Sequence, residues 1–280
     1  MNKNKGLNNE YFLQNEQLPN EDTEPKNVTG IELLPINKFL FSILLGHFCD
    51  KHGPTIVMVT QVGSISTGGD ELLVPDFPTD SYCESCSMHI SNNLVKDSST
   101  KTDTKSMRSV IADSVYVSTQ YSLIRYQLMT QVIRKAFSEE TISYDSSPLI
   151  FFDDIRGLNF VMGFKLYDDQ ARGNERRYSL IFNINTKNSK AAMNILANNW
   201  DFIEGGFLKI IHYIQHKHEE DIKRQLEKEN EDGGFTPMVG TFLRANKVKT
   251  SKNLSELTKD ELIFIKLHKW NSYILKSLLV

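Results

Sequence analysis

The chain has 280 residues, of which 40% are hydrophobic and 10% aromatic, so it can bury the core of one large domain or two small ones. Its formal net charge of -3 argues against a chain-wide attraction to nucleic acid or to anionic lipid. The three cysteines do not make a disulfide framework, and no run approaches the roughly 18 apolar residues of a membrane-spanning helix. We therefore expect a soluble protein of the cytoplasm.

The N-terminal part of the chain predicts a tail followed by a hairpin. Residues 1–35 are rich in Asn, Glu and Lys and predict a disordered tail, because they bury too little apolar surface to offset chain entropy. Two apolar runs within residues 39–62 flank "DKHGP", in which Gly53 permits an unusual backbone angle and Pro54 stops helical continuation. This pattern predicts a hairpin of two largely buried strands.

A change of composition follows the hairpin. Residues 63–114 are dominated by Ser, Thr, Gly, Asp and Lys, with only scattered apolar residues. About fifty residues without clear periodicity are too many for a tight connection between strands. We expect a polar, partly disordered insertion at the surface.

The remaining elements are predicted from hydrophobic periodicity. Residues 122–137 have the spacing of a one-faced helix, and the runs 148–152, 158–167 and 177–184 predict a meander of antiparallel strands. A helical pattern over residues 190–231 contains Gly205 and Gly206, which cost roughly 1 kcal/mol each relative to Ala, so we expect a break there. Beyond His216 the pattern is nearly all charged and predicts a solvated extension. A last helix follows Thr258, which has capping-box spacing to Glu261.

The element order predicts the fold class. Because turns separate the strands more often than helices do, we expect an α/β (α+β) domain whose mainly antiparallel sheet is covered by helices. The domain is expected at residues 36–232, with a linker and C-terminal helix at 233–280.

Cysteine and histidine residues suggest two kinds of chemistry. Cys83 and Cys86 in "YCESC" have the spacing at which two thiolates share one zinc, with His89 three positions later. A closed site needs four ligands, so Cys49, His47 or His52 would have to come from the hairpin. We interpret Cys83 and Cys86 as free thiols in a loop, with no metal, and keep zinc as the alternative.

Enzymatic interpretations are weaker. A thiol–imidazole nucleophile of Cys49 and His52 is less expected than a buried small residue beside an exposed turn residue. A thioredoxin-type redox motif belongs at the mouth of a βαβ unit, whereas "CESC" lies in a polar insertion. Phosphate-loop, dinucleotide, zincin and hydrolase signatures are absent from the sequence. We expect neither a self-contained enzyme nor a cofactor.

The segment "QARGNERRYS" contains three of the nine arginines. The neighbouring acids nearly cancel its charge, which argues against nucleic-acid binding. Arg172 is predicted near the loop apex beside Gly173, from which a long and permanently charged side chain can reach outward. Arg176 is expected to contribute to the charge balance of the loop, and Arg177 to begin the next strand and cap a carboxylate.

Several motifs together resemble one family. "GHFCDKHGP", "CESC", "VYVSTQY", "ARGNERRYS" and the "FTP" of residues 235–237 occur in the order of the folliculin family, and the match covers most of residues 39–280. It is closest to the short fungal folliculin-like proteins. The resemblance implies a longin domain, with a five-stranded antiparallel sheet sandwiched by helices, and no DENN module after the last helix.

The resemblance also implies a function. Family members pair with a folliculin-interacting-type longin-DENN protein and activate GTP hydrolysis by a Rag-type GTPase in amino-acid signalling to TOR kinase. They act at the vacuolar or lysosomal surface, to which partners recruit them. In the A-R-G motif of this family the arginine is the arginine finger, and here that residue is Arg172.

Two further interpretations compete with a GTPase-activating subunit. A non-catalytic longin scaffold would assemble a signalling or trafficking complex and leave the arginines solvated. A vesicle-fusion longin SNARE is disfavoured, because no sustained coiled-coil segment or membrane anchor follows the domain.

Overall fold

The computed structural model describes residues 40–63, 83–90, 106–111, 114–120, 126–138, 142–231 and 252–279. The predicted tail at 1–35 lies outside these residues, as does most of the predicted linker after residue 232.

One antiparallel sheet organises the structure. Its seven strands lie in the order β3-β4-β2-β1-β7-β6-β5. The strands are β1 (Phe41–Cys49), β2 (Gly53–Gly63), β3 (Ser106–Ile111), β4 (Ser114–Thr119), β5 (Asp145–Asp153), β6 (Gly157–Tyr167) and β7 (Glu175–Ile184). The predicted hairpin is confirmed as β1–β2, and the predicted meander as β5–β6–β7.

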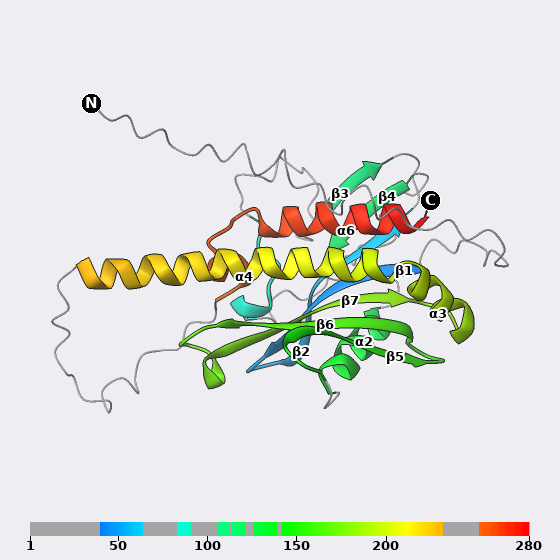
Figure 1. Cartoon of the computed structure of the whole chain (residues 1–280), viewed down its shortest axis with the longest axis horizontal. Coiled ribbons are helices and arrows are strands. Elements are labelled where there is room, and N and C mark those ends of the chain that lie inside the picture. The colour runs from blue at the N-terminus through cyan, green and yellow to red at the C-terminus, as the bar shows by residue number, and fades with distance from the viewer. Residues whose placement is uncertain are drawn as a thin grey trace.

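Helices cover both faces of the sheet (Figure 1). The helices are α2 (Tyr126–Ser138), α3 (Ser189–Asn198), α4 (Trp200–Glu231), α5 (Leu254–Thr258) and α6 (Ile263–Leu279). Figure 1 shows α4 and α6 side by side across one face, while α2 packs on the opposite face. The mixed α+β class with a helix-covered antiparallel sheet is therefore confirmed.

Strand periodicity divides the core into two layers. Tyr178, Leu180, Phe182 and Ile184 of β7 alternate along the strand and join the larger core under α4 and α6. Ile181, between them, belongs to the second core with α2. Because side chains alternate across a strand, one sequence run serves both layers.

The expectation of five strands was wrong, because the sheet has seven. The two additional strands, β3 and β4, come from the end of the predicted polar insertion and its border. Residues Val115–Thr119 of β4 pair with the second half of β2, at positions Val59–Gly63. Strands of six residues with much serine carry a weak local signal and need an existing sheet edge on which to form. The insertion's stretches 64–82, 91–105 and 112–113 lie outside the described residues.

The break in the long helical pattern also differs from the prediction. It falls at Asn199, between α3 and α4, and Gly205 and Gly206 continue within α4. A Cβ atom on Gly206 would lie 3.1 Å from Ile274 Cδ1 of α6. Glycine at this position therefore permits close packing of α4 against α6 and does not end the helix.

The capping box predicted for the last helix lies instead at the start of the preceding helix, α5. The capping box consists of Asn253 and Glu256 at the start of α5, while the Thr258 hydroxyl donates a hydrogen bond to the carbonyl oxygen of Leu254. The charged end of α4 is not entirely solvated either, because His218 is buried and hydrogen-bonds the carbonyl oxygen of Leu257 at 2.8 Å.

Candidate functional site

The connection between β6 and β7, residues 168–174, forms a compact loop. We name residues 168–177, which include the first three residues of β7, the arginine loop. The Asp168 amide donates a hydrogen bond to the carbonyl oxygen of Asn174 at 3.0 Å, and this bond closes the loop. Gly173 and Asn174 both adopt positive φ, 71° and 59°. A Cβ atom on Gly173 would meet nothing within 4 Å, so the backbone angle, not lack of space, accounts for glycine there.

The three arginines of the loop have different environments. Arg172 is exposed, and its guanidinium has no hydrogen-bond or ion-pair partner within the described part of the chain. Arg177 is also exposed, and its guanidinium lies over the Tyr144 ring at 5.5 Å from the centroid. The predicted contact of Arg177 with a carboxylate is thus replaced by a cation–π contact, and β7 begins two residues earlier, at Glu175.

Arg176 was expected to balance the loop charge, but it is buried. Its Nε donates a hydrogen bond to Asp168 Oδ2 at 2.8 Å, and the two side chains are only 5% and 0% exposed. Asp168 also lies 3.6 Å from the ammonium of Lys252. A buried carboxylate needs such partners because desolvation penalises its charge. The pair therefore joins the loop to the core beneath it.

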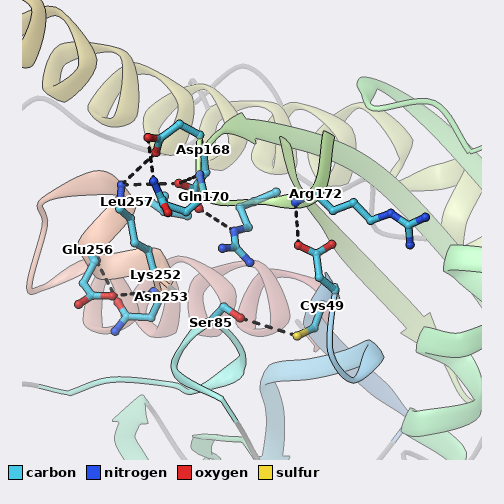
Figure 2. Close-up of polar contacts among 12 residues, drawn as sticks. Cys49, Ser85, Asp168, Gln170, Arg172, Lys252, Asn253, Glu256 and Leu257 are labelled. Carbon is cyan, nitrogen blue, oxygen red and sulfur yellow. Dashed lines mark hydrogen bonds and ion pairs between the residues drawn. The ribbon is translucent and has the colours of Figure 1, made fainter. Parts of the chain in front are cut away.

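The backbone at Arg172 is held by the neighbouring β1–β2 hairpin. Its amide donates a hydrogen bond to Asp50 Oδ2 at 2.9 Å, and Asp50 lies in the turn of the β1–β2 hairpin. Figure 2 shows the side chain of Arg172 extending away from the groups around Asp168 and Cys49. An anchored backbone with an outward side chain can present a guanidinium to a partner protein.

Three cysteines and a histidine meet beside this loop. They are Cys49 and His52 of the hairpin, Cys86 of the η4 turn (Glu84–Cys86) and Cys83, which directly precedes that turn. We name them the Cys₃His cluster. One potential ligand atom from each residue lies within 4.8 Å of every other. The predicted loop cysteines thus pack against the hairpin, and Cys49 and Cys86 are buried.

The other histidines named from the sequence lie outside the Cys₃His cluster. His47 Nδ1 donates a hydrogen bond to the carbonyl oxygen of Arg177 at 3.0 Å, and its ring stacks on Tyr178. His89 has a half-exposed side chain whose Nδ1 lies 4.0 Å from Glu84 Oε1. Spacing alone had not distinguished His52 from these two.

Proton sharing within the Cys₃His cluster is asymmetric. A hydrogen bond from Cys86 lowers the pKa of the Cys49 thiol, and the backbone amide of Lys51, 3.4 Å from Cys49 Sγ, acts in the same direction. Hydrogen bonding to Cys49 and burial raise the pKa of Cys86. Cys86 is therefore the donor and Cys49 the acceptor of the hydrogen bond between the two side chains.

A chain of contacts connects the Cys₃His cluster with the arginine loop. Asn253 Nδ2 donates a hydrogen bond to Glu84 Oε1 at 3.2 Å, and the neighbouring Lys252 reaches Asp168. Figure 2 shows Lys252 and Asn253 on one side of Ser85, with Lys252 extending toward Asp168. The roles of Asp50, Asp168 and Lys252 were not apparent from the sequence, because each acts through a residue at least eight positions away in the chain.

The fold and site define a helix-covered antiparallel-sheet protein that presents one arginine from a strand connection. A family model described as "Folliculin: Vesicle coat protein involved in Golgi to plasma membrane transport" matches residues 114–278. The chain is also similar to protein LST7 of Saccharomyces cerevisiae, with 48% identity over 240 residues that cover 85% of this chain and 96% of that protein. The chain belongs to the folliculin family, as the sequence motifs predicted.

The helices of the described residues differ from what a membrane-spanning helix requires. None of those in the described residues combines the length and apolar character that crossing a bilayer requires. The 32-residue helix α4 is long enough, but its second half is rich in charged residues.

Proposed function

We propose that this chain is the GTPase-activating subunit of a heterodimer, and that Arg172 is the arginine finger. The GTPase would be of the Rag type, acting in amino-acid signalling to TOR kinase. The observation that carries the proposal is the presentation of Arg172, whose backbone Asp50 anchors while its guanidinium stays exposed and unpaired within the described residues.

The chemistry of GTP hydrolysis suits a single presented arginine. Negative charge on the transferring phosphoryl group is stabilised by a guanidinium, which is worth roughly 10³ to 10⁵ in rate. The GTPase itself supplies the nucleotide pocket and Mg²⁺, so the activating chain needs no phosphate-binding loop. The local acids are engaged elsewhere, since Asp168 pairs with Arg176 and Glu175 with Lys165 at 2.7 Å. The guanidinium of Arg172 therefore remains available to a partner.

The sheet supports assignment of a longin domain. Without the β3–β4 hairpin, five antiparallel strands remain in the order β2-β1-β7-β6-β5, with helices on both faces. That arrangement agrees with the five-stranded sandwich that the family resemblance implies. We propose that β3 and β4 extend a longin sheet at its β2 edge.

The family description suggests a broader setting for this activity. We propose that the chain also takes part in transport from the Golgi to the plasma membrane, the process named for the matching family. Its partner would be a folliculin-interacting-type longin-DENN protein, and membrane contact at the vacuolar or lysosomal surface would come through such partners.

The test is a single-turnover assay of GTP hydrolysis by the Rag-type GTPase with the heterodimer present. We expect Arg172→Ala to reduce the stimulated rate by roughly 10³-fold or more, with binding of both partners retained. Arg172→Lys keeps a charge but loses the planar guanidinium, so it should also fail to restore the rate. Arg134→Ala, which removes another exposed arginine on α2, is the matched control and should leave hydrolysis unchanged.

The outcome separates an activating subunit from a scaffold. If the Arg172→Ala heterodimer binds the GTPase and stimulates hydrolysis as well as the wild type, the finger assignment is wrong. The chain would then act as a non-catalytic scaffold, in which the arginine loop is only solvated.

A further inference from the structure

Two segments of the chain that are far apart in sequence converge on the Cys₃His cluster. Cys49 and His52 come from the end of β1 and the hairpin turn, whereas Cys83 precedes the 3-10 turn η4 and Cys86 is its last residue. The fold thus brings together the only three cysteines of the sequence. Hydrophobic packing does not account for the convergence, because the imidazole of the exposed His52 is directed at the buried Cys86.

Four of the distances between ligand atoms of the Cys₃His cluster are close to those of a tetrahedral metal site. Zn–S bonds of about 2.3 Å and Zn–N bonds of about 2.0 Å place two sulfurs about 3.8 Å apart, and a sulfur and a nitrogen about 3.5 Å apart. Cys83 Sγ lies 3.5 Å from Cys49 Sγ and 3.6 Å from Cys86 Sγ. His52 Nδ1 lies 3.7 Å from Cys49 Sγ and 3.5 Å from Cys86 Sγ.

A disulfide would need a different geometry. A bonded pair of sulfurs is separated by about 2.05 Å, far less than either sulfur distance involving Cys83. A disulfide between any two cysteines would also not explain why the third thiol and the imidazole lie beside them. Four ligand atoms within 4.8 Å of one another are better explained by one central ion.

Groups around the sulfurs are suited to hold them as thiolates. The Lys51 amide donates to Cys49 Sγ at 3.4 Å, and the Ser85 hydroxyl lies 3.0 Å from Cys83 Sγ. The η4 turn is closed by the Cys86 amide, which donates to the Cys83 carbonyl oxygen at 3.0 Å. This turn fixes the spacing of its two cysteines. Supporting hydrogen bonds of this kind orient metal ligands.

We propose that Cys49, His52, Cys83 and Cys86 bind one structural Zn²⁺ ion. Three thiolates and one imidazole form a ligand set that selects zinc, and four protein ligands leave no open position for a substrate. The ion would join the hairpin turn to the η4 turn. Both turns support the arginine loop, because Asp50 holds the Arg172 amide and Glu84 contacts Asn253. The zinc site would thus stabilise the two turns that support the arginine loop.

Metal content of the purified full-length chain tests the proposal. Elemental analysis should find about one zinc per chain, and a mercurial reagent that titrates the three thiols should release it. Cys86→Ser and His52→Ala should each lower the zinc content at least about tenfold after mild chelation, because each removes a ligand. His89→Ala, which removes a histidine outside the Cys₃His cluster, is the control and should keep the full content.

Cobalt provides a second readout that does not depend on the ligand variants folding. The apo chain titrated with Co²⁺ should show the visible bands of tetrahedral thiolate coordination and saturate near one equivalent. Amide exchange in the arginine loop should be at least about tenfold faster in the apo chain than in the zinc-loaded chain, because the ion no longer joins the two supporting turns. A folded chain with less than about a tenth of an equivalent of zinc and no cobalt bands would overturn the site. Stoichiometric iron in place of zinc would overturn the assignment of the ion.

Discussion

The amide of Arg172 donates a hydrogen bond to the carboxylate of Asp50, a residue 122 positions earlier in the chain. The bond spans the β6–β7 and β1–β2 connections, which lie at the same end of the sheet because β1 pairs antiparallel with both β2 and β7. Asp50 therefore fixes where the arginine leaves the backbone, whereas the loop's own hydrogen bonds determine its shape.

Asp50→Ala should loosen the arginine loop without unfolding the chain. A single net hydrogen bond contributes about 0.5–1.5 kcal/mol, so amide exchange at Arg172 should become roughly 3- to 10-fold faster. Asp50→Asn keeps a side-chain oxygen as acceptor and should behave nearly as the wild type. Hydrogen exchange resolved at residue 172 measures both, and equal rates in Asp50→Ala and wild type would contradict the anchoring role.

Arg176→Met should destabilise the fold much more than loss of an exposed pair. Among the described residues it leaves the buried Asp168 carboxylate with only the more distant Lys252 as a cation, so we expect a loss of about 3 kcal/mol in the free energy of unfolding. Lys165→Met removes the partly exposed pair with Glu175 and should cost under about 1 kcal/mol. Urea denaturation of the two variants compares them directly. A cost below 1 kcal/mol for Arg176→Met would show that the buried pair is not needed.

The two neighbouring glycines of α4 provide a matched pair of variants. Gly205→Ala places its Cβ in open space and should stabilise the helix by about 0.5–1 kcal/mol. Gly206→Ala gains the same helix propensity but places its Cβ 3.1 Å from Ile274 Cδ1, so the Ile274 side chain must give way within the packed α4–α6 contact. We expect Gly206→Ala to be the less stable of the two in thermal denaturation. The reverse order would contradict close packing of α4 on α6.

Buried His268 should make stability depend on pH. Burial, with the charge of Lys269 adding to it, lowers the pKa of this imidazole from 6.5 to about 4. The imidazole is then neutral in the folded chain, and below pH 6.5 the unfolded chain binds the proton first. The contribution of the neutral imidazole to the free energy of unfolding is complete above pH 6.5. It is lost as the pH falls toward 4, and the loss is at most about 3 kcal/mol.

Replacement of His268 tests this contribution. His268→Gln keeps a polar partner for the Ser118 hydroxyl, which lies 2.7 Å from His268 Nδ1. It should reduce the slope of unfolding free energy against pH within that window, measured by urea denaturation at a series of pH values. His216→Gln removes an exposed imidazole of α4 and serves as the control. An unchanged slope in His268→Gln would contradict the assignment.

Local patterns predicted most of the elements. The alternation from Tyr178 to Ile184 predicts a strand with one buried face, and that face lies under α4 and α6. The opposite face is buried too, because Ile181 packs in the second core with α2. The glycine of the arginine loop was also correctly associated with a backbone angle that favours it. Such features depend on nearest neighbours, so they are visible in a short stretch of sequence.

Patterns failed where a distant segment decided the outcome. A helix break was expected at Gly206, but this glycine leaves room for Ile274 of α6, 68 residues further along the chain. Strands β3 and β4 have little signal of their own and depend on the free edge of β2. Arg176 looked like a solvated charge because the burial of Asp168 was not apparent from the sequence.

The sequence by itself determined the family, the antiparallel meander, the hairpin and the loop that carries Arg172, because each is encoded in contiguous residues. Only the tertiary structure separated Arg172 from the buried Arg176, attached it to Asp50, and gathered Cys49 and His52 around Cys83 and Cys86. Burial and distance between side chains depend on how the strands are ordered in the sheet, and no local stretch of sequence specifies that order.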